Sequence, residues 1–202
     1  MILKSERVAE LLNAEDQNDP LIITPRPDLE GLKSSGAASI DLRLGSWFAA
    51  MRRSRASHLK LIGELEGADA RFLSKMHFVR FGDTFVLHPQ QFVLGVTLEW
   101  IRLPKDCAGY VTSRSSWGRR GLVIATAVGV HPGFSGCLTL ELINLGELPV
   151  KLSPGLAICQ LFIHQVSYSS HTVDRSIFVG ERKPVLGEIG LDDFAEKLRR
   201  PI

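Results

Sequence analysis

The chain has 202 residues, 45% of them hydrophobic and 23% charged, which is ordinary for a soluble globular protein with a substantial core. The net charge of +2 provides no strong field for attracting nucleic acid. No apolar stretch is long enough for a signal peptide or a membrane helix, so we expect a cytoplasmic protein that binds neither nucleic acid nor membranes.

The N-terminal part predicts one helix followed by strands. Residues 5–14 have the apolar spacing of a short amphipathic helix, and a strand between prolines follows in residues 19–27. Residues 38–48 alternate in polarity, which places the apolar side chains inward and Asp41 and Arg43 outward. We interpret these two charged residues as a pair on the sheet face or between subunits.

The rest of the chain predicts short strands separated by turns. Residues 83–104 contain two strands around a His-Pro-Gln-Gln turn, and further strands are predicted at 137–144, 148–152 and 157–166. Residues 52–78 are polar and weakly patterned, which indicates a long hairpin or loop. Short strands with Gly and Pro between them and little helix predict an all-β barrel or sandwich.

The sequence contains no internal repeat and no low-complexity segment. We therefore expect a single domain over residues 1–202. From about residue 168 to 202 the pattern is typical of a tail or lid, and residues 191–200 within it predict a helix.

The stretch "HPGFSGCLTLELIN", residues 131–144, places a carboxylate in the middle of an apolar strand. Its leucines share one face, and Glu141 lies on the other. Glu141 could pair with an arginine of a neighbouring strand or subunit, which is the commoner fate of a carboxylate in a sheet. It could instead act as a general base. The pattern alone leaves both possibilities open.

A second polar stretch, "TSRSSWGRRGL", lies at residues 112–122. Arg114, Ser115 and Ser116 before a helix-like turn would direct a guanidinium, hydroxyls and backbone N–H groups toward one point, as phosphate binding requires. Ser115 and Arg119 are four residues apart, so a helical turn places them on one face. The alternative is a solvated basic turn in which the serines cap the helix.

Several kinds of active site do not fit the sequence. It has no GxSxG elbow, P-loop or GxGxxG motif, and its six histidines show no metal-binding spacing. The zinc signature of cytidine deaminases, HxE with PCxxC, is absent too. Cys107, Cys137 and Cys159 are far apart in apolar stretches, so we interpret them as buried thiols and expect no metal ligands from protein side chains.

In their order along the chain, four stretches resemble the motifs of the dCTP deaminase branch of the dUTPase superfamily. "ASIDLRLG" is similar to the first motif, "SRSSWGRRG" to the second, "VGVHPGFSGCLTLELIN" to the third and "PGLAICQLFI" to the fourth. The resemblance covers roughly residues 1–165. It implies a β-clip fold, a distorted jelly-roll-like barrel, and a homotrimer with active sites between subunits.

The same resemblance implies an enzyme of pyrimidine deoxyribonucleotide metabolism, a hydrolase that converts dCTP to dUTP and ammonia without zinc. Mg²⁺ would enter with the substrate triphosphate. Glu141 matches the catalytic glutamate that activates water for attack on C4 of cytosine. Ser115 and Arg119 match the residues that order this water and support the charge developing at the ring. True dUTPases have no glutamate at this strand position.

Other positions match the nucleotide contacts of this family. Arg114 and Ser116 match triphosphate contacts, the backbone of residues 139–141 matches the strand that contacts the pyrimidine edge, and Ala127 matches the small residue beside the attacking water. Trp117 is interpreted as a core residue that could also wall the base pocket. The nucleotide-binding residues implied in this way are Arg114, Ser115, Ser116, Trp117, Gly118, Arg119, Ala127, His131, Thr139, Leu140, Glu141 and Lys183.

Two regions depart from the family pattern. His131 occupies the position of an aspartate that lies beside the deoxyribose and that, in dUTPases, also positions the water attacking the phosphate. The tail keeps Lys183, which matches a phosphate ligand, but has Pro184 in place of a tyrosine. Three alternatives therefore stay open: a bifunctional enzyme converting dCTP to dUMP, a deaminase of another cytosine nucleotide, and a non-catalytic, nucleotide-binding regulatory protein on the same scaffold.

Overall fold

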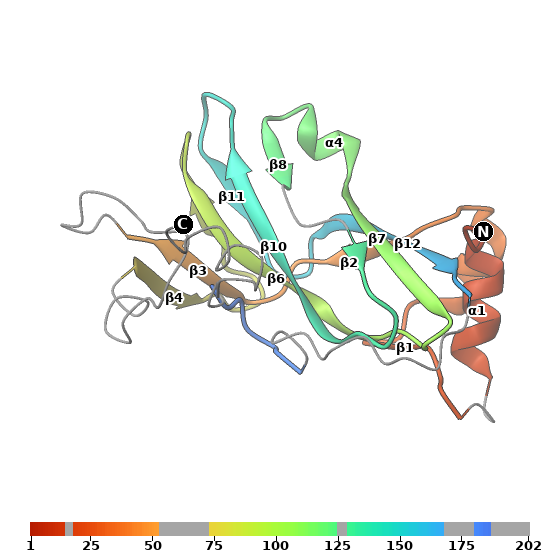
Figure 1. Cartoon of the computed structure of the whole chain (residues 1–202). Helices are drawn as coiled ribbons and strands as arrows, with labels where there is room; N and C mark the ends of the chain where they lie inside the picture. The colour runs from red at the N-terminus through yellow and green to blue at the C-terminus, as the bar shows by residue number, and fades with distance from the viewer. Residues whose placement is uncertain (15–17, 53–72, 125–128, 168–179, 187–202) are drawn as a thin grey trace, which may run out of the picture.

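Antiparallel sheets form the body of the computed structural model, which describes residues 1–14, 18–52, 73–124, 129–167 and 180–186 (Figure 1). Strands outnumber helices among these residues, and the helices are short, which confirms the predicted mainly-β fold class. The described elements, in chain order, are α1 (Ser5–Asn13), β1 (Ile22–Thr24), α2 (Leu29–Ser35), β2 (Ile40–Arg43), β3 (Trp47–Met51), β4 (Ser74–Phe78), β5 (Phe85–Leu87), β6 (Phe92–Arg102), β7 (Cys107–Ser113), α4 (Ser115–Gly118), β8 (Leu122–Ile124), β9 (Gly129–Val130), β10 (Ser135–Asn144), β11 (Val150–Leu152) and β12 (Ala157–Gln165).

The larger sheet has the strand order β4-β3-β6-β10-β8, and β1 also pairs with β6. Its longest ladder joins β10 to β6 over Ser135 to Ile143. Every second side chain of β10 is buried, which confirms the alternation predicted from the sequence. One face of this strand packs into the core, and the opposite face carries Glu141.

The second sheet has the order β2-β12-β7-β9, and β11 and β5 form a separate pair. Strand β2 alternates as predicted, with Ile40 and Leu42 buried and Asp41 and Arg43 exposed. Buried apolar side chains from both sheets belong to one hydrophobic cluster. The core therefore lies between the two sheets, and each sheet also has an outer face.

The N-terminal residues extend the second sheet along β12. The Leu3 N–H donates to the Ile163 carbonyl at 2.8 Å, and the Gln165 N–H donates to the Met1 carbonyl at 3.1 Å. Strand β2 pairs with the same strand from its other end, at Ala157. The beginning of the chain is thus held by the last strand before the C-terminal segment.

Two helices lie together at one end of the sheets (Figure 1). Helix α1 confirms the helix predicted for residues 5–14. Helix α2 was not predicted: it buries no residue, and Gly36 ends it in the left-handed conformation at φ 63°. A helix without a buried face leaves no apolar periodicity in the sequence.

The polar stretch at 52–78 includes the second strand of a long hairpin, since β3 pairs with β4 in antiparallel register. This confirms the hairpin interpretation, although residues 53–72 lie outside the described part of the chain. The helix predicted at 191–200 lies outside it too. The assignment of 1–202 to one domain with a tail stays a prediction. No helix among the described residues is long and apolar enough to cross a membrane.

The ladder between β10 and β6 contains a bulge near its middle. Cys137 lies opposite Trp100. Thr139, two residues further along β10, lies opposite Val96, four residues back along β6. The extra residues of β6 bend the strand away from its partner, as bulges do, and re-aim the neighbouring side chains.

The Thr97 hydroxyl replaces the missing backbone contacts of this bulge. It accepts a hydrogen bond from the Leu138 N–H at 2.9 Å and donates one to the Glu99 carbonyl at 2.8 Å. Thr97 is buried, so its hydroxyl satisfies polar backbone groups that water does not reach.

Candidate functional site

Glu141 lies on the outer face of the larger sheet. It is directly opposite Leu94 of β6, and Leu94 is in turn opposite Ala49 of β3. Directly opposite residues of antiparallel strands project their side chains to the same face. The carboxylate therefore has apolar neighbours along this row of the sheet, and Glu141 is partly buried.

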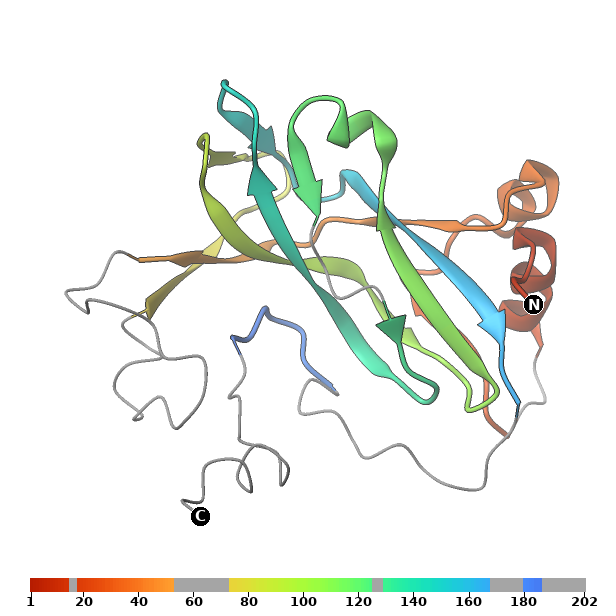
Figure 2. The ribbon, with the colours of Figure 1, turned by 45° about the horizontal axis from the view of Figure 1, so that its top comes forward.

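One edge of β10 faces the C-terminal segment, residues 180–186. The Gly180 N–H donates to the Ser135 carbonyl at 2.7 Å, and the Cys137 N–H donates to the Glu181 carbonyl at 3.0 Å. Figure 2 shows this segment as a blue ribbon below the larger sheet. Backbone groups of alternate residues in a strand point to the same side. Those of residues 139 and 141 therefore point to this edge as well.

Strand β8 covers the same edge only beyond residue 141, because its pairing with β10 runs from Leu142 to Asn144. Thr139 thus lies between β8 and the C-terminal segment. The backbone contact of residues 139–141 with a pyrimidine stays a prediction, and this edge has the polarity that such a contact requires.

The predicted helix-like turn is α4, which directly follows Arg114. The Arg119 N–H donates to the Ser115 carbonyl at 3.1 Å. The residues Ser115, Ser116 and Arg119 are exposed. Trp117 packs against the core, and its Nε1–H donates to the Ala157 carbonyl at 2.8 Å. Trp117 is partly buried and packs against the core cluster, in line with the structural role predicted for it, and it attaches the polar turn to β12.

Arg114, the residue before α4, forms an ion pair with Asp41 of β2. The guanidinium lies 2.7 Å from Asp41 Oδ2, and the Gln160 amide of β12 donates to Asp41 Oδ1 at 3.1 Å. Both carboxylate oxygens therefore have a partner. The expectation that Asp41 and Arg43 pair with each other on the sheet face is wrong, because Asp41 has partners from two other elements. A pair between subunits stays a prediction.

Arg43 instead pairs with Glu99, a residue that the sequence did not single out. Glu99 is 2% exposed and accepts the Arg43 backbone N–H at 2.8 Å and its guanidinium at 2.9 Å. Burial raises the pKa of the Glu99 carboxyl, and the bonds from Arg43 oppose this rise. The signal in the sequence is an acidic residue within the long apolar strand at 92–102, but its partner lies 56 positions away.

The turn after α4 is held against the loop after β10 by a close approach of two glycines. Gly121 has φ 82°, and a Cβ added there would lie 2.5 Å from the backbone nitrogen of Gly146. The Leu145 N–H also donates to the Gly121 carbonyl at 2.8 Å. The position of the basic turn relative to the end of β10 is therefore set by backbone contact.

His131 begins the tight turn that leads into β10. Its carbonyl accepts from the Phe134 N–H at 3.1 Å, and Gly133 has φ 76°. Proline followed by a positive-φ glycine is typical of a type II turn. The His131 residue is exposed, at the same end of β10 as Ser135.

Lys183 lies on the C-terminal segment, with its Nζ 4.2 Å from the centre of the Trp47 ring. The next residue, Pro184, is buried. Ala127, the remaining predicted site residue, lies outside the described part of the chain. Across the described residues no group of three or more His, Cys, Asp or Glu side chains is placed to hold a metal ion.

The cysteine prediction is confirmed at two of three positions. Cys107 and Cys159 are buried, and burial raises the pKa of each thiol to about 12. Cys137 is only partly buried; burial raises the pKa of its thiol, and the guanidinium of Arg182 opposes that rise.

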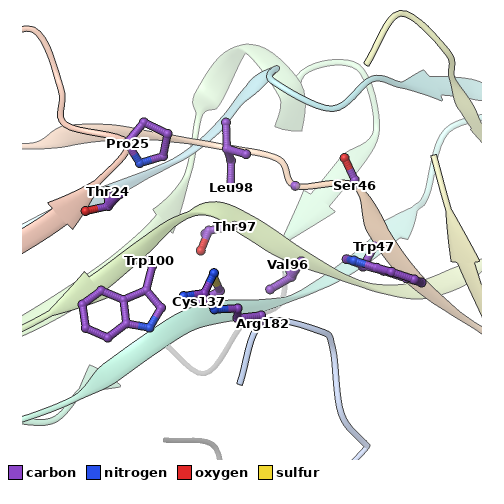
Figure 3. A pocket seen from close by; sticks show the side chains of 11 residues that line it. Thr24, Pro25, Ser46, Trp47, Val96, Thr97, Leu98, Trp100, Cys137 and Arg182 are labelled. Atoms are coloured by element: carbon purple, nitrogen blue, oxygen red, sulfur yellow. The ribbon is translucent and has the colours of Figure 1, made fainter. Parts of the chain in front are cut away.

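A pocket of about 490 Å³ opens beside the bulge, on the outer face of the larger sheet (Figure 3). Figure 3 shows the indole rings of Trp47 and Trp100 at opposite ends, with Cys137 and Arg182 between them. The pocket is lined by Thr24, Pro25, Gly45, Ser46, Trp47, Val96, Thr97, Leu98, Trp100, Cys137 and Arg182.

Comparison with known proteins gives one family and one informative fold. The sequence profile of the family described as dCTP deaminase-like matches residues 2–166. The structure is similar to that of 2'-deoxycytidine 5'-triphosphate deaminase from Agrobacterium tumefaciens, with a TM-score of 0.57 and 22% identity. The similarity covers 80% of this chain but only 46% of that one, so this chain spans about half the length of that protein.

Two dUTPases match this structure with lower TM-scores and over a smaller part of the chain. For the dUTPase of EIAV the TM-score is 0.38 at 23% identity, covering 50% of this chain and 83% of that one. For the dUTPase of Staphylococcus bacteriophage 80alpha it is 0.38 at 19% identity, covering 64% and 97%. Both TM-scores are below 0.5, so the similarity of fold rests on the first structure.

Proposed function

The chain belongs to the dCTP deaminase-like family and has a mostly-β fold similar to that of a dCTP deaminase, and from this we propose that it hydrolyses dCTP to dUTP and ammonia. Glu141 is the general base in this proposal. The observation that carries it is the position of this carboxylate on an otherwise apolar sheet row, beside the edge of β10 to which we assign the pyrimidine.

The proposed reaction needs one water molecule and no redox partner. The Glu141 carboxylate takes a proton from the water, whose oxygen bonds to C4 of the cytosine ring. The carboxyl group delivers this proton to N3 of the ring, then takes the remaining proton from the new C4 hydroxyl and passes it to the amino group. The C4–N bond breaks, which releases ammonia and leaves the C4 carbonyl and the N3–H of dUTP. A positioned acid–base group of this kind contributes roughly 10²–10⁴-fold in rate.

We propose that the polar turn at α4 binds the triphosphate and supports the reaction at the cytosine ring. Ser115 and Arg119 order the water and support the charge at the ring, and Arg114 and Ser116 contact the triphosphate, which brings Mg²⁺ with it. Ser115, Ser116 and Arg119 are exposed, and Trp117 anchors the turn that carries them. This arrangement supports their binding of a substrate rather than packing within the chain. We propose that α4 of one subunit completes the site of another in a homotrimer.

The test follows ammonia release and the cytosine-to-uracil absorbance change in purified protein with dCTP and Mg²⁺. Glu141→Gln should lower kcat by about 10²-fold or more. Glu147→Gln removes the same charge from the exposed loop after β10 and should keep wild-type activity. Equal activity of wild type and Glu141→Gln would contradict the role of Glu141.

Pyrophosphate measured in the same samples distinguishes the reaction from dUMP formation. The proposal expects ammonia without pyrophosphate, because His131 replaces the aspartate that dUTPases use to position a phosphate-attacking water. Pyrophosphate in stoichiometric amounts would show a bifunctional enzyme. Bound dCTP with no ammonia would show a regulatory protein.

A further inference from the structure

The pocket beside the bulge contains none of the residues assigned above to the dCTP site. On β10 it reaches Cys137, four residues from Glu141, which is about 13 Å in an extended strand. On β6 it reaches Val96, which is directly opposite Thr139, so the pocket adjoins the proposed dCTP site without sharing its residues. Its volume of about 490 Å³ falls within the range of ligand pockets. The proposed reaction therefore leaves this pocket without a role.

The lining of the pocket combines aromatic surface with a single positive charge. The indole of Trp100 lines one end, and the bulge places it there, since Trp100 is the residue at which β6 regains register with Cys137. Arg182 is an exposed residue of the C-terminal segment, close enough to the Cys137 thiol that its charge opposes the rise in the thiol's pKa caused by burial. None of the described lining residues is acidic.

Contacts of the residues before and after Arg182 hold this part of the C-terminal segment in place. Before it, the Glu181 carbonyl accepts from the Cys137 N–H. After it, Lys183 lies over the Trp47 ring and Pro184 is buried. Lys183 therefore anchors the segment, and the cation left to face the pocket is Arg182.

From this lining we propose that the pocket is a second binding site, for an aromatic anion. The planar ring of the ligand packs against Trp100, and its anionic group pairs with the Arg182 guanidinium. A nucleoside monophosphate and an aromatic carboxylate share this chemistry. Because the ligand would contact both β10 and the C-terminal segment, its binding would hold the two together.

The experiment uses Cys137 as a local reporter, because its thiol lines the pocket whereas Cys107 and Cys159 are buried. The rate of its alkylation by iodoacetamide is followed by mass spectrometry on the full chain with dUMP, indole-3-acetate or inorganic phosphate. We expect dUMP or indole-3-acetate to slow alkylation at least fivefold at saturation, and inorganic phosphate, which has no ring, to have no such effect. Which of the two aromatic anions protects at the lower concentration identifies the source of the ligand.

Variants then test the two contacts through the concentration of dUMP or indole-3-acetate that gives half protection. Arg182→Gln and Trp100→Leu should raise it at least tenfold, and Trp100→Phe, which keeps an aromatic ring, should raise it less. Arg7→Gln, which removes an exposed arginine of α1, should leave it within twofold. Melting temperatures confirm that each variant is folded.

Two results would overturn the proposal. One is protection that is absent with both aromatic anions or unchanged in Arg182→Gln and Trp100→Leu. The other is protection lost equally in the double variant Ser115→Ala, Arg119→Gln, since the ligand would then occupy the proposed dCTP site. The readout is binding, so absence of dCTP turnover would defeat the proposed function and leave this result intact.

Discussion

The guanidinium of Arg114 lies 2.7 Å from the Asp41 carboxylate, and this pair joins the turn at α4 to strand β2. The Gln160 amide donates to the other carboxylate oxygen, which fixes the orientation of the carboxylate. The fixed carboxylate in turn holds the Arg114 guanidinium in one position. A guanidinium fixed in this way can meet a phosphate oxygen without first losing side-chain freedom. Asp41 is thus a positioning residue for Arg114 in the proposed dCTP site.

Asp41→Asn should therefore raise the KM for dCTP about three- to tenfold with little change in kcat. The stability effect should stay below about 1 kcal/mol, because both side chains of the pair are partly exposed to solvent. Steady-state kinetics and urea unfolding measure both quantities, with Asp83→Asn in an exposed turn as the control. A change confined to stability would show that Asp41 has no part in binding substrate.

Glu99 should make the stability of the protein depend on pH. Its pKa is raised above the ordinary 4.5, so the folded state holds the proton more tightly than the unfolded chain. This contribution is fully present below pH 4.5 and is lost as the pH rises through the folded pKa. The stability of wild type relative to Glu99→Gln should therefore fall over that interval and then level off.

Urea unfolding of both proteins at pH values from 4 to 8 measures this difference. Asp19→Asn is a suitable comparison, since its ion pair with Arg102 is much more exposed than Glu99. A stability difference that is constant over the whole interval would contradict the raised pKa.

Lys183→Met should loosen the C-terminal segment. A cation over an indole contributes roughly 0.5–1 kcal/mol at an exposed site, so the Cys137 N–H, which donates to this segment, should exchange its hydrogen about two- to fivefold faster. Hydrogen exchange followed by NMR resolves this amide, and Lys75→Met on β4 provides the control. Unchanged exchange with a large rise in the KM for dCTP would instead support Lys183 as the phosphate ligand predicted from the sequence.

Gly121→Ala should destabilise the fold by roughly 1–3 kcal/mol. The added methyl would meet the Gly146 backbone at 2.5 Å, and φ 82° is unfavourable for alanine. Gly129→Ala is the matched control, because a Cβ there meets nothing within 4 Å and its φ is not in the left-handed range. Equal unfolding free energies for the two variants would show that the two loops separate easily.

Local patterns predicted most of the strands and the polar turn. The alternation along β10 and β2 depends on consecutive residues only, so the sequence identified their buried faces. It also identified Glu141 as a carboxylate within an apolar strand. The same holds for α4, where Trp117 among polar neighbours indicated a core anchor. The roles of these residues in catalysis remain predictions.

The features that escaped prediction depend on contacts between distant parts of the chain. The Arg43–Glu99 pair and the bulge both arise from register between strands, which no single stretch of sequence contains. The C-terminal segment is a further example: the family pattern selected Lys183, but the contact with Trp47 leaves Arg182 facing the pocket.

The pairing of Met1 and Leu3 with β12 has a consequence for synthesis on the ribosome. Met1 and Leu3 have no partner until Ile163 and Gln165 are synthesised, and β2 needs the same strand. Such distant pairing makes folding slow, because the chain must close a long loop before any contact stabilises it. A nascent chain arrested before residue 157 would expose β2 and residues 1–3 as unpaired edges, the kind of surface to which chaperones bind.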